Sequence, residues 1–153
     1  MKNRIGIYLL TVLAVLAFAS CSKGVVYSRF MPILSENWHV DSIAQFDYTI
    51  SDADADYSML VYVRHTERYP YQNMWLFVGD SLHRDTIEFY LADDRGQWLG
   101  DKHHGFIEMP VLFEENYHFP DTGTYSIFIQ HGMRDSVLRG VTDVGIEIFK
   151  ISN

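Results

Sequence analysis

Apolar and polar residues alternate along several short segments of the chain, and this pattern limits the fold more than any other feature of the sequence. In residues 44–50 every even position is apolar, and in residues 86–91 the alternate positions Ile87, Phe89 and Leu91 are apolar. Residues 124–130 and 144–148 repeat the pattern. Successive side chains of a β-strand point to opposite faces, so the alternation predicts strands with one buried face each.

Two other segments, residues 59–63 and 74–78, are almost continuously apolar, which predicts central strands covered on both faces. Turn-forming residues separate the predicted strands at 51–56, 68–71, 79–81, 93–96 and 120–123. Gly96 is expected at positive φ in a hairpin loop, and one helical turn is expected over Val137 and Leu138. The predicted fold class is all-β, a single antiparallel β-sandwich of immunoglobulin-like or jelly-roll-like type.

One short motif supports a sandwich. The segment Asp121-Thr122-Gly123-Thr124-Tyr125 has the D-x-G-x-Y form of a tyrosine corner. In such a corner the tyrosine hydroxyl donates a hydrogen bond to the backbone of the preceding turn. Ile127 then stands where an immunoglobulin domain would place its second cysteine.

The first 21 residues have the layout of an export signal. Lys2 and Arg4 form a basic start, and residues 5–19 are nearly all apolar. This run spans ~22 Å as a helix, short of the ~30 Å hydrocarbon core, which favours a cleaved signal over an uncleaved transmembrane anchor. The segment Phe18-Ala19-Ser20-Cys21 resembles the bacterial lipoprotein box, with phenylalanine in place of the usual leucine.

Cys21 is therefore the predicted lipidation site. Residues 1–20 are the predicted signal peptide, 21–26 a lipidated tether, and 27–153 the β-sandwich domain. Cleavage leaves 10 of the 12 Lys and Arg residues against 20 Asp and Glu, a net charge of −10. This acid excess argues against nucleic-acid binding, and a single cysteine excludes an internal disulfide or a multi-cysteine metal site.

The aromatic residues are the strongest pointer to a binding role, at 15% of the chain. Tyr69, Tyr71 and Trp75 cluster around Pro70, partly in a predicted loop. With Arg134 from a later connection they form the candidate partner or ligand surface, because Tyr, Trp and Arg are enriched in interfaces. Alternatively, Trp75 is a core residue whose edge the two tyrosines cover.

A metal site would use His103 and His104 with Asp93, Asp94 or Asp101. On a strand the two imidazoles would point to opposite faces, so only a loop would let them share an ion. We therefore favour structural or surface histidines.

The acidic stretch around Asp52, Asp54 and Asp56 imitates the start of an EF-hand loop. Tyr57 and Val63 stand where that loop needs glycine and a bidentate glutamate, which favours an acidic turn. The chain also has no G-x-S-x-G and no glycine-rich phosphate loop. We expect no metal, no cofactor and no enzymatic activity.

A family resemblance appears at three segments: Tyr69-Pro70-Tyr71-Gln72-Asn73-Met74-Trp75-Leu76-Phe77, Gly123-Thr124-Tyr125 and His131-Gly132-Met133-Arg134. With the lipoprotein signal, they resemble the gliding-motility lipoprotein GldH family over essentially the whole mature chain. The resemblance implies a lipoprotein of Bacteroidetes-type bacteria that is linked to the surface gliding machinery, with no established enzymatic activity. Relatives also occur in bacteria that do not glide.

The resemblance implies a membrane-anchored, non-catalytic envelope component of the gliding apparatus or its associated protein-secretion machinery, in contact with other envelope proteins. Surface-exposed lipoproteins of these bacteria often carry an acidic run after the cysteine. Residues 22–25 have none, which favours an outer-membrane position facing the periplasm. Two alternatives remain: a carbohydrate-binding lipoprotein with Trp38, Trp75 or Trp98 as its stacking platform, and a metal-dependent hydrolase around His103 and His104.

Overall fold

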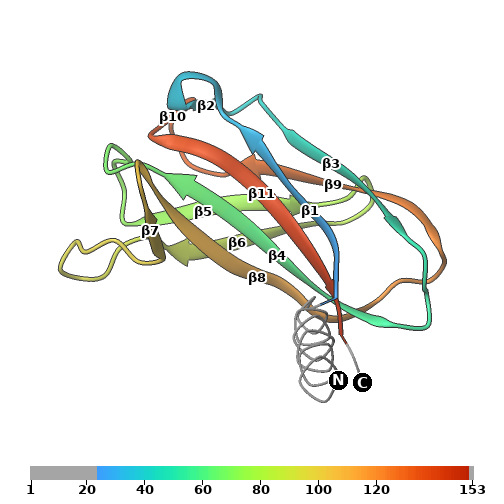
Figure 1. The fold of residues 1–153 in the computed structure, drawn as a ribbon. Helices are drawn as coiled ribbons and strands as arrows, with labels where there is room; N and C mark the ends of the chain where they lie inside the picture. The colour runs from blue at the N-terminus through green and yellow to red at the C-terminus, as the bar shows by residue number, and fades with distance from the viewer. Residues whose placement is uncertain (1–23, 152–153) are drawn as a thin grey trace, which may run out of the picture.

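A computed structural model describes residues 24–151, which are folded almost entirely into β-strands (Figure 1). The strands are β1 (Val25–Pro32), β2 (Asn37–His39), β3 (Ala44–Ile50), β4 (Asp56–His65), β5 (Asn73–Gly79), β6 (Arg84–Tyr90), β7 (Asp101–His103), β8 (Phe106–His118), β9 (Gly123–His131), β10 (Val137–Arg139) and β11 (Val141–Lys150). One 3-10 turn, η1 (Leu34–Glu36), connects β1 to β2. No helix within residues 24–151 is long and apolar enough to cross a membrane.

Two antiparallel sheets pack face to face. Sheet A has the order β1-β11-β4-β8-β7, and sheet C has the order β3-β9-β5-β6. Counting only the eight long strands, the first pairs with the eighth and the second with the seventh, and the sheets read 1-8-3-6 and 2-7-4-5. This is the jelly-roll arrangement. The predicted sandwich is confirmed, and the strand order selects the jelly-roll alternative over the immunoglobulin one.

The core lies between the inner faces of the two sheets. Along β3 buried and exposed positions alternate without a break, as the sequence pattern predicts. The central strands β4 and β11 contribute Val61, Val63 and Ile146, each with no exposed surface. Burial of each such side chain stabilises the fold by roughly 1.5–3 kcal/mol. Trp38 and Leu138, opposite one another in the small β2–β10 sheet, are also fully buried and close one end of the core.

Two local predictions from the sequence are confirmed. Gly96 has a φ of 76° in the turn that joins Ala92 to Trp98. The Tyr125 hydroxyl donates a 2.7 Å hydrogen bond to the Asp121 carbonyl, which is the expected bond of a tyrosine corner. Both features depend only on residues a few positions apart in the chain.

Two other predictions are wrong. The strands β4 and β5 are not covered on both faces, because a two-layer sandwich leaves the outer face of each sheet to solvent; Trp75 on β5 is 38% exposed. Val137 and Leu138 form no helical turn but belong to β10. Pairing with β2 sets Leu138 opposite Trp38, and this burial outweighs any local helical preference.

The sandwich has two distinct ends (Figure 1). We call the end that carries Gly24, where the described chain begins, the near end; the connections 51–55 and 119–122 also lie there. At the far end lie the connections 66–72, 91–100 and 132–136. β1 begins at Val25, two residues before the expected start of the domain at Tyr27.

Candidate functional site

The structure places three of the four predicted surface residues at the surface of the far end. Trp75 and Tyr71 are 38% and 37% exposed, and Arg134 is exposed just after β9. Tyr69 is only 3% exposed, so the expectation of a surface position for it is wrong. Its hydroxyl donates a 2.8 Å hydrogen bond to the Asn73 carbonyl, which holds the ring inward.

Residues 132–135 run beside Trp75 and bring the other candidates to it. The Gly132 amide donates a 2.7 Å hydrogen bond to the Trp75 carbonyl, and the Trp75 amide lies 3.3 Å from the Met133 sulfur. The Tyr71 hydroxyl donates a 2.6 Å bond to the Asp135 carboxylate, which raises the pKa of Tyr71. The connections 66–72 and 132–136 therefore lie side by side next to the start of β5, and Tyr71, Trp75 and Arg134 belong to one surface.

Trp75 belongs to a row of aromatic residues on the outer face of sheet C. Within β5, Phe77 lies on the same face two positions further along. Tyr90 on β6 pairs with Asn73, and Phe128 on β9 pairs with Gly79. We call Tyr90, Trp75, Phe77 and Phe128 the aromatic row. Tyr90 is 54% exposed, and it was missed by the sequence analysis because its neighbours depend on strand register.

The remaining tryptophans lie elsewhere. Trp38 is fully buried, and its indole N–H donates a 2.7 Å hydrogen bond to the Ser42 carbonyl. It is therefore excluded as part of a stacking platform, contrary to the carbohydrate-binding alternative. Trp98 is half-buried at the far end, 4.7 Å from the ring of the buried His65.

A recess of about 400 Å³ opens beside Trp98. Its aromatic walls are Tyr69, Tyr71 and Trp98, and its acidic residues are Asp93 and Asp94. The Tyr69 ring lies at 78° to Tyr71 and at 63° to Trp98, with centroids 6.0 and 6.4 Å apart. We call this site the recess.

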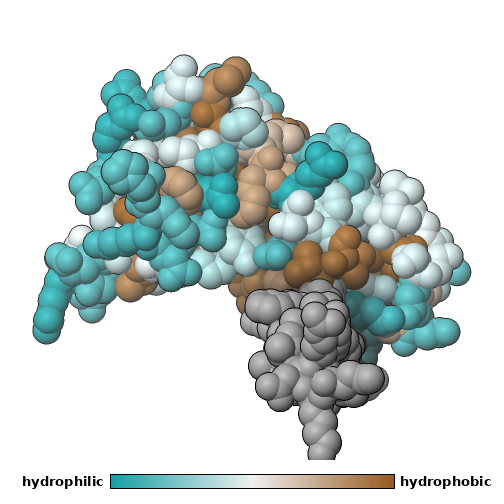
Figure 2. Space-filling model, viewed as in Figure 1, coloured by the Kyte–Doolittle hydropathy of each residue, from teal (hydrophilic) through white to brown (hydrophobic). Residues whose placement is uncertain are grey.

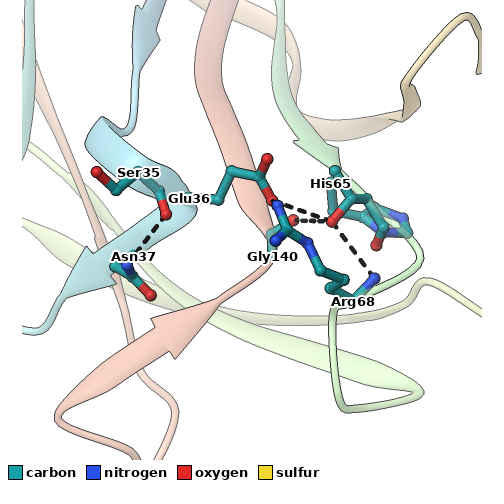
Figure 3. Close-up of polar contacts among 7 residues, drawn as sticks. Ser35, Glu36, Asn37, His65, Arg68 and Gly140 are labelled. Carbon is teal, nitrogen blue, oxygen red and sulfur yellow. Dashed lines mark hydrogen bonds and ion pairs between the residues drawn. The ribbon is translucent and has the colours of Figure 1, made fainter.

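A polar network at the far end fixes the connection that carries Tyr69 (Figure 3). Glu36 forms an ion pair with Arg68 and lies 3.3 Å from the Thr66 hydroxyl. The Thr66 amide donates a 2.8 Å hydrogen bond to the Gly140 carbonyl, and the Gly140 amide donates one to Glu36. Three segments far apart in sequence thus hold one corner of the far end.

Two buried histidines also lie at this end. His65 and His131 have no exposed surface. Nε2 of His65 and both ring nitrogens of His131 lack a hydrogen-bond partner within the described residues. Burial lowers the pKa of both side chains, because the charged imidazolium would lose its hydration. Both are therefore held neutral in the folded state.

We predict that acidification destabilises the fold through these two histidines. The pKa values of both side chains are lowered in the folded state, so below pH ~6.5 the unfolded chain binds more protons than the folded one. The free energy of unfolding therefore decreases as the pH is lowered. The slope reaches at most ~1.4 kcal/mol per pH unit for each histidine. Urea unfolding between pH 5 and 8 measures it.

The double variant His65→Gln, His131→Gln should be less stable at pH 8 but show a flatter slope. His39→Gln is the matched control, because the His39 side chain is half exposed. Equal slopes for the wild type and the double variant would refute the assignment.

The proposed metal ligands do not converge. His103 ends β7, and its ring stacks on Phe106 at 4.9 Å, while His104 lies in the following turn. The Asp93 carboxylate accepts hydrogen bonds from the Arg95 and Gln97 amides. Across residues 24–151, no group of three or more His, Cys, Asp or Glu side chains is placed to hold a metal ion.

The acidic stretch after β3 is an internally bonded turn. The Asp52 carboxylate accepts a 3.1 Å hydrogen bond from the Asp54 amide and pairs with Lys150. The Tyr57 hydroxyl donates to the Asp52 carbonyl at 2.7 Å. These contacts give the stretch a structural role.

Comparison with known proteins agrees with the resemblance of the three motifs. The family model described as GldH lipoprotein matches residues 25–148. The chain is 30% identical to a gliding motility lipoprotein GldH homolog of Christiangramia forsetii, over 93% of this chain and 94% of that relative. It is also 30% identical to the gliding motility lipoprotein GldH of Flavobacterium johnsoniae, over 89% and 91%. The chain belongs to the GldH lipoprotein family.

Proposed function

We propose that this lipoprotein is a non-catalytic component of the gliding-motility apparatus or of its associated protein-secretion machinery. Lipid on Cys21 holds it in the outer membrane, facing the periplasm, and its far end docks other envelope proteins. The observation that carries the docking role is the exposure of Trp75 beside Tyr71 and Arg134. These are the residue types that contribute most to the free energy of protein–protein binding.

The position of Gly24 supports this orientation. Val25 follows Cys21 by four positions, which span at most ~14 Å. The near end therefore lies against the lipid surface, and the far end points away from it. Figure 2 shows hydrophobic surface beside the start of the described chain, where Val25 and Val26 are 46% and 39% exposed. The end around β7 is mostly hydrophilic (Figure 2).

Crosslinking in living cells tests the proposal. A photoreactive phenylalanine analogue replaces Trp75, Tyr71 or Tyr90 in the lipidated protein, and captured proteins are identified by mass spectrometry. We expect envelope proteins of the motility or secretion machinery at these positions and not at Leu112, which is 53% exposed on β8 of sheet A. Failure to capture such proteins, with a working crosslinker, would contradict the proposal.

Trp75→Ala is predicted to weaken docking strongly while the fold persists. Truncation of a central interface tryptophan costs ~2 kcal/mol or more, which is about a 30-fold loss in affinity. Trp75 lies on an outer sheet face, so the free energy of unfolding should fall by less than ~1 kcal/mol. Co-purification of the partners captured by crosslinking measures the loss, with Leu112→Ala on the opposite sheet as the matched control. Unchanged co-purification of the partners with Trp75→Ala would show that the aromatic row does not belong to the interface.

A carbohydrate ligand is the second candidate for the same face. Tyr90 and Trp75 are both exposed in one row, and sugar rings stack on such aromatic faces. Titration with an oligosaccharide such as cellopentaose, followed through Trp75 fluorescence in a Trp38→Phe, Trp98→Phe background, tests it. Saturable quenching would favour the sugar, and its absence would leave the protein-docking role.

A further inference from the structure

We propose that the recess binds one cationic side chain, the guanidinium of an arginine or the ammonium of a lysine, presented by a partner protein. This inference rests on the proposed docking function and specifies what the far end recognises. It concerns the recess lined by Tyr69, Tyr71 and Trp98, not the aromatic row on sheet C.

The charge of the recess favours a cation. Asp93 and Asp94 line it, and no lysine, arginine or histidine is among its lining residues. Asp135 adds a third carboxylate beside it, held by the Tyr71 hydroxyl. Arg95, in the same turn as the two aspartates, is exposed and is not among the residues that line the recess. His65 packs behind Trp98 and is neutral, so it adds no opposing charge.

The aromatic walls favour the same kind of guest. A guanidinium or ammonium group is attracted to the faces of Trp and Tyr rings by the ring quadrupole. The exposed Tyr71 and the half-buried Trp98 offer ring surface to a cation, and the buried Tyr69 packs edge-on against both as the inner wall. A volume of about 400 Å³ accommodates a single long side chain but not a folded element.

The recess is already assembled without a guest. The Asp93 carboxylate accepts hydrogen bonds from the Arg95 and Gln97 amides, which fixes the turn on one side. The Gln72 carbonyl accepts from the amides of Leu91 and Ala92, and the Gln72 side chain donates to the Asp93 carbonyl at 2.7 Å. Because these groups are held in place, binding costs little ordering of the walls. Asp94 also lines the recess and is exposed, so its carboxylate is accessible to a ligand.

The test follows the three indole N–H resonances of the full-length lipidated protein in detergent micelles. The chain has 3 tryptophans, and each reports on a different place: Trp98 on the recess, Trp75 on the aromatic row, and Trp38 on the core. The probes are N-acetyl-arginine methylamide and N-acetyl-lysine methylamide. N-acetyl-citrulline methylamide, which matches arginine in shape but carries no charge, and cellopentaose are the comparison compounds.

We expect the arginine and lysine probes to shift the Trp98 resonance saturably and to leave Trp38 unmoved. The citrulline probe should bind ~10-fold more weakly, since it lacks the charge. Asp94→Asn should weaken arginine binding by about threefold, a shift of ~0.6 kcal/mol. Asp41→Asn is the matched control, because the Asp41 side chain is 85% exposed outside the recess.

Three results would overturn the inference: equal binding of citrulline and arginine, no Trp98 shift at 50 mM arginine probe, or a Trp98 shift with cellopentaose alone. The last would assign the recess to a glycan. Each result leaves the docking proposal intact if Trp75 and Tyr90 still crosslink to envelope proteins. If those crosslinks are absent and the Trp98 shift is present, the docking role of the aromatic row is wrong and the recess still binds a cation.

Discussion

A Gly140→Ala variant should lose about 3 kcal/mol or more of folding free energy. Gly140 joins β10 to β11 with a φ of 83°, a conformation that costs other residues ~1–2 kcal/mol. A Cβ at this position would lie 2.5 Å from the Tyr69 backbone nitrogen and 2.8 Å from the Arg68 carbonyl carbon. Backbone hydrogen bonds to Glu36 and Thr66 prevent Gly140 from moving away.

Gly96→Ala separates the cost of the positive φ from the cost of the steric clash. Gly96 has a similar φ of 76°, but no atom lies within 4 Å of its added Cβ. It should therefore lose only the conformational cost, ~1 kcal/mol. Urea unfolding of both variants measures their losses in the free energy of unfolding. The difference between the two losses is the cost of the clash with the Tyr69 backbone. Equal losses for the two variants would show that the close approach of Gly140 to Tyr69 contributes nothing to stability.

The sequence was sufficient for features that depend on neighbouring residues. The alternation in residues 44–50 predicts β3 because side-chain direction in a strand repeats every two residues. The tyrosine corner at Tyr125 and the positive φ of Gly96 are likewise local, and both are present. The continuous run 74–78 was misread because periodicity alone does not distinguish a covered outer face from one lined by aromatic residues, such as Trp75 and Phe77.

The candidate sites depend on contacts between distant segments, which no periodicity contains. Tyr90 joins the aromatic row only because β6 pairs with β5 in the register that sets it opposite Asn73. The recess combines residues 69–72, from the β4–β5 connection, with residues 92–98, from the β6–β7 connection. Tyr69 lies in a loop as predicted, yet a hydrogen bond from its hydroxyl to Asn73 and packing against the rings of His65, Tyr71 and Trp98 bury its side chain.

The recess and the Tyr90 and Trp75 part of the aromatic row lie at the far end, and this shared position has a physical consequence. With lipid on Cys21, as proposed, the short tether at the near end would restrict how far the domain can move from the lipid surface. A partner is then met at a roughly fixed height above the membrane, which raises the effective concentration of the two proteins without any additional contact. The anchor and the docking end are therefore expected to fail together when lipidation is lost.

Cys21→Ser is accordingly predicted to have the largest effect on location. Cys21 lies outside the described residues, and it is the only cysteine of the chain. Serine offers no thiol for acylation, and each lost acyl CH₂ removes ~0.8 kcal/mol of membrane affinity. Labelling with a fatty-acid analogue should disappear, and the protein should leave the membrane fraction. The fold should be unchanged, since no cysteine lies within residues 24–151.

Ser22→Ala is the matched control, because it changes the neighbouring hydroxyl and retains the thiol. It should keep both acyl labelling and membrane retention. If Cys21→Ser stays fully in the membrane fraction, the apolar run at residues 5–19 acts as an uncleaved anchor and the lipid assignment is wrong. If the variant is released but still docks its partners at wild-type levels, the tether does not set the height of the far end, and docking depends on the aromatic surfaces alone.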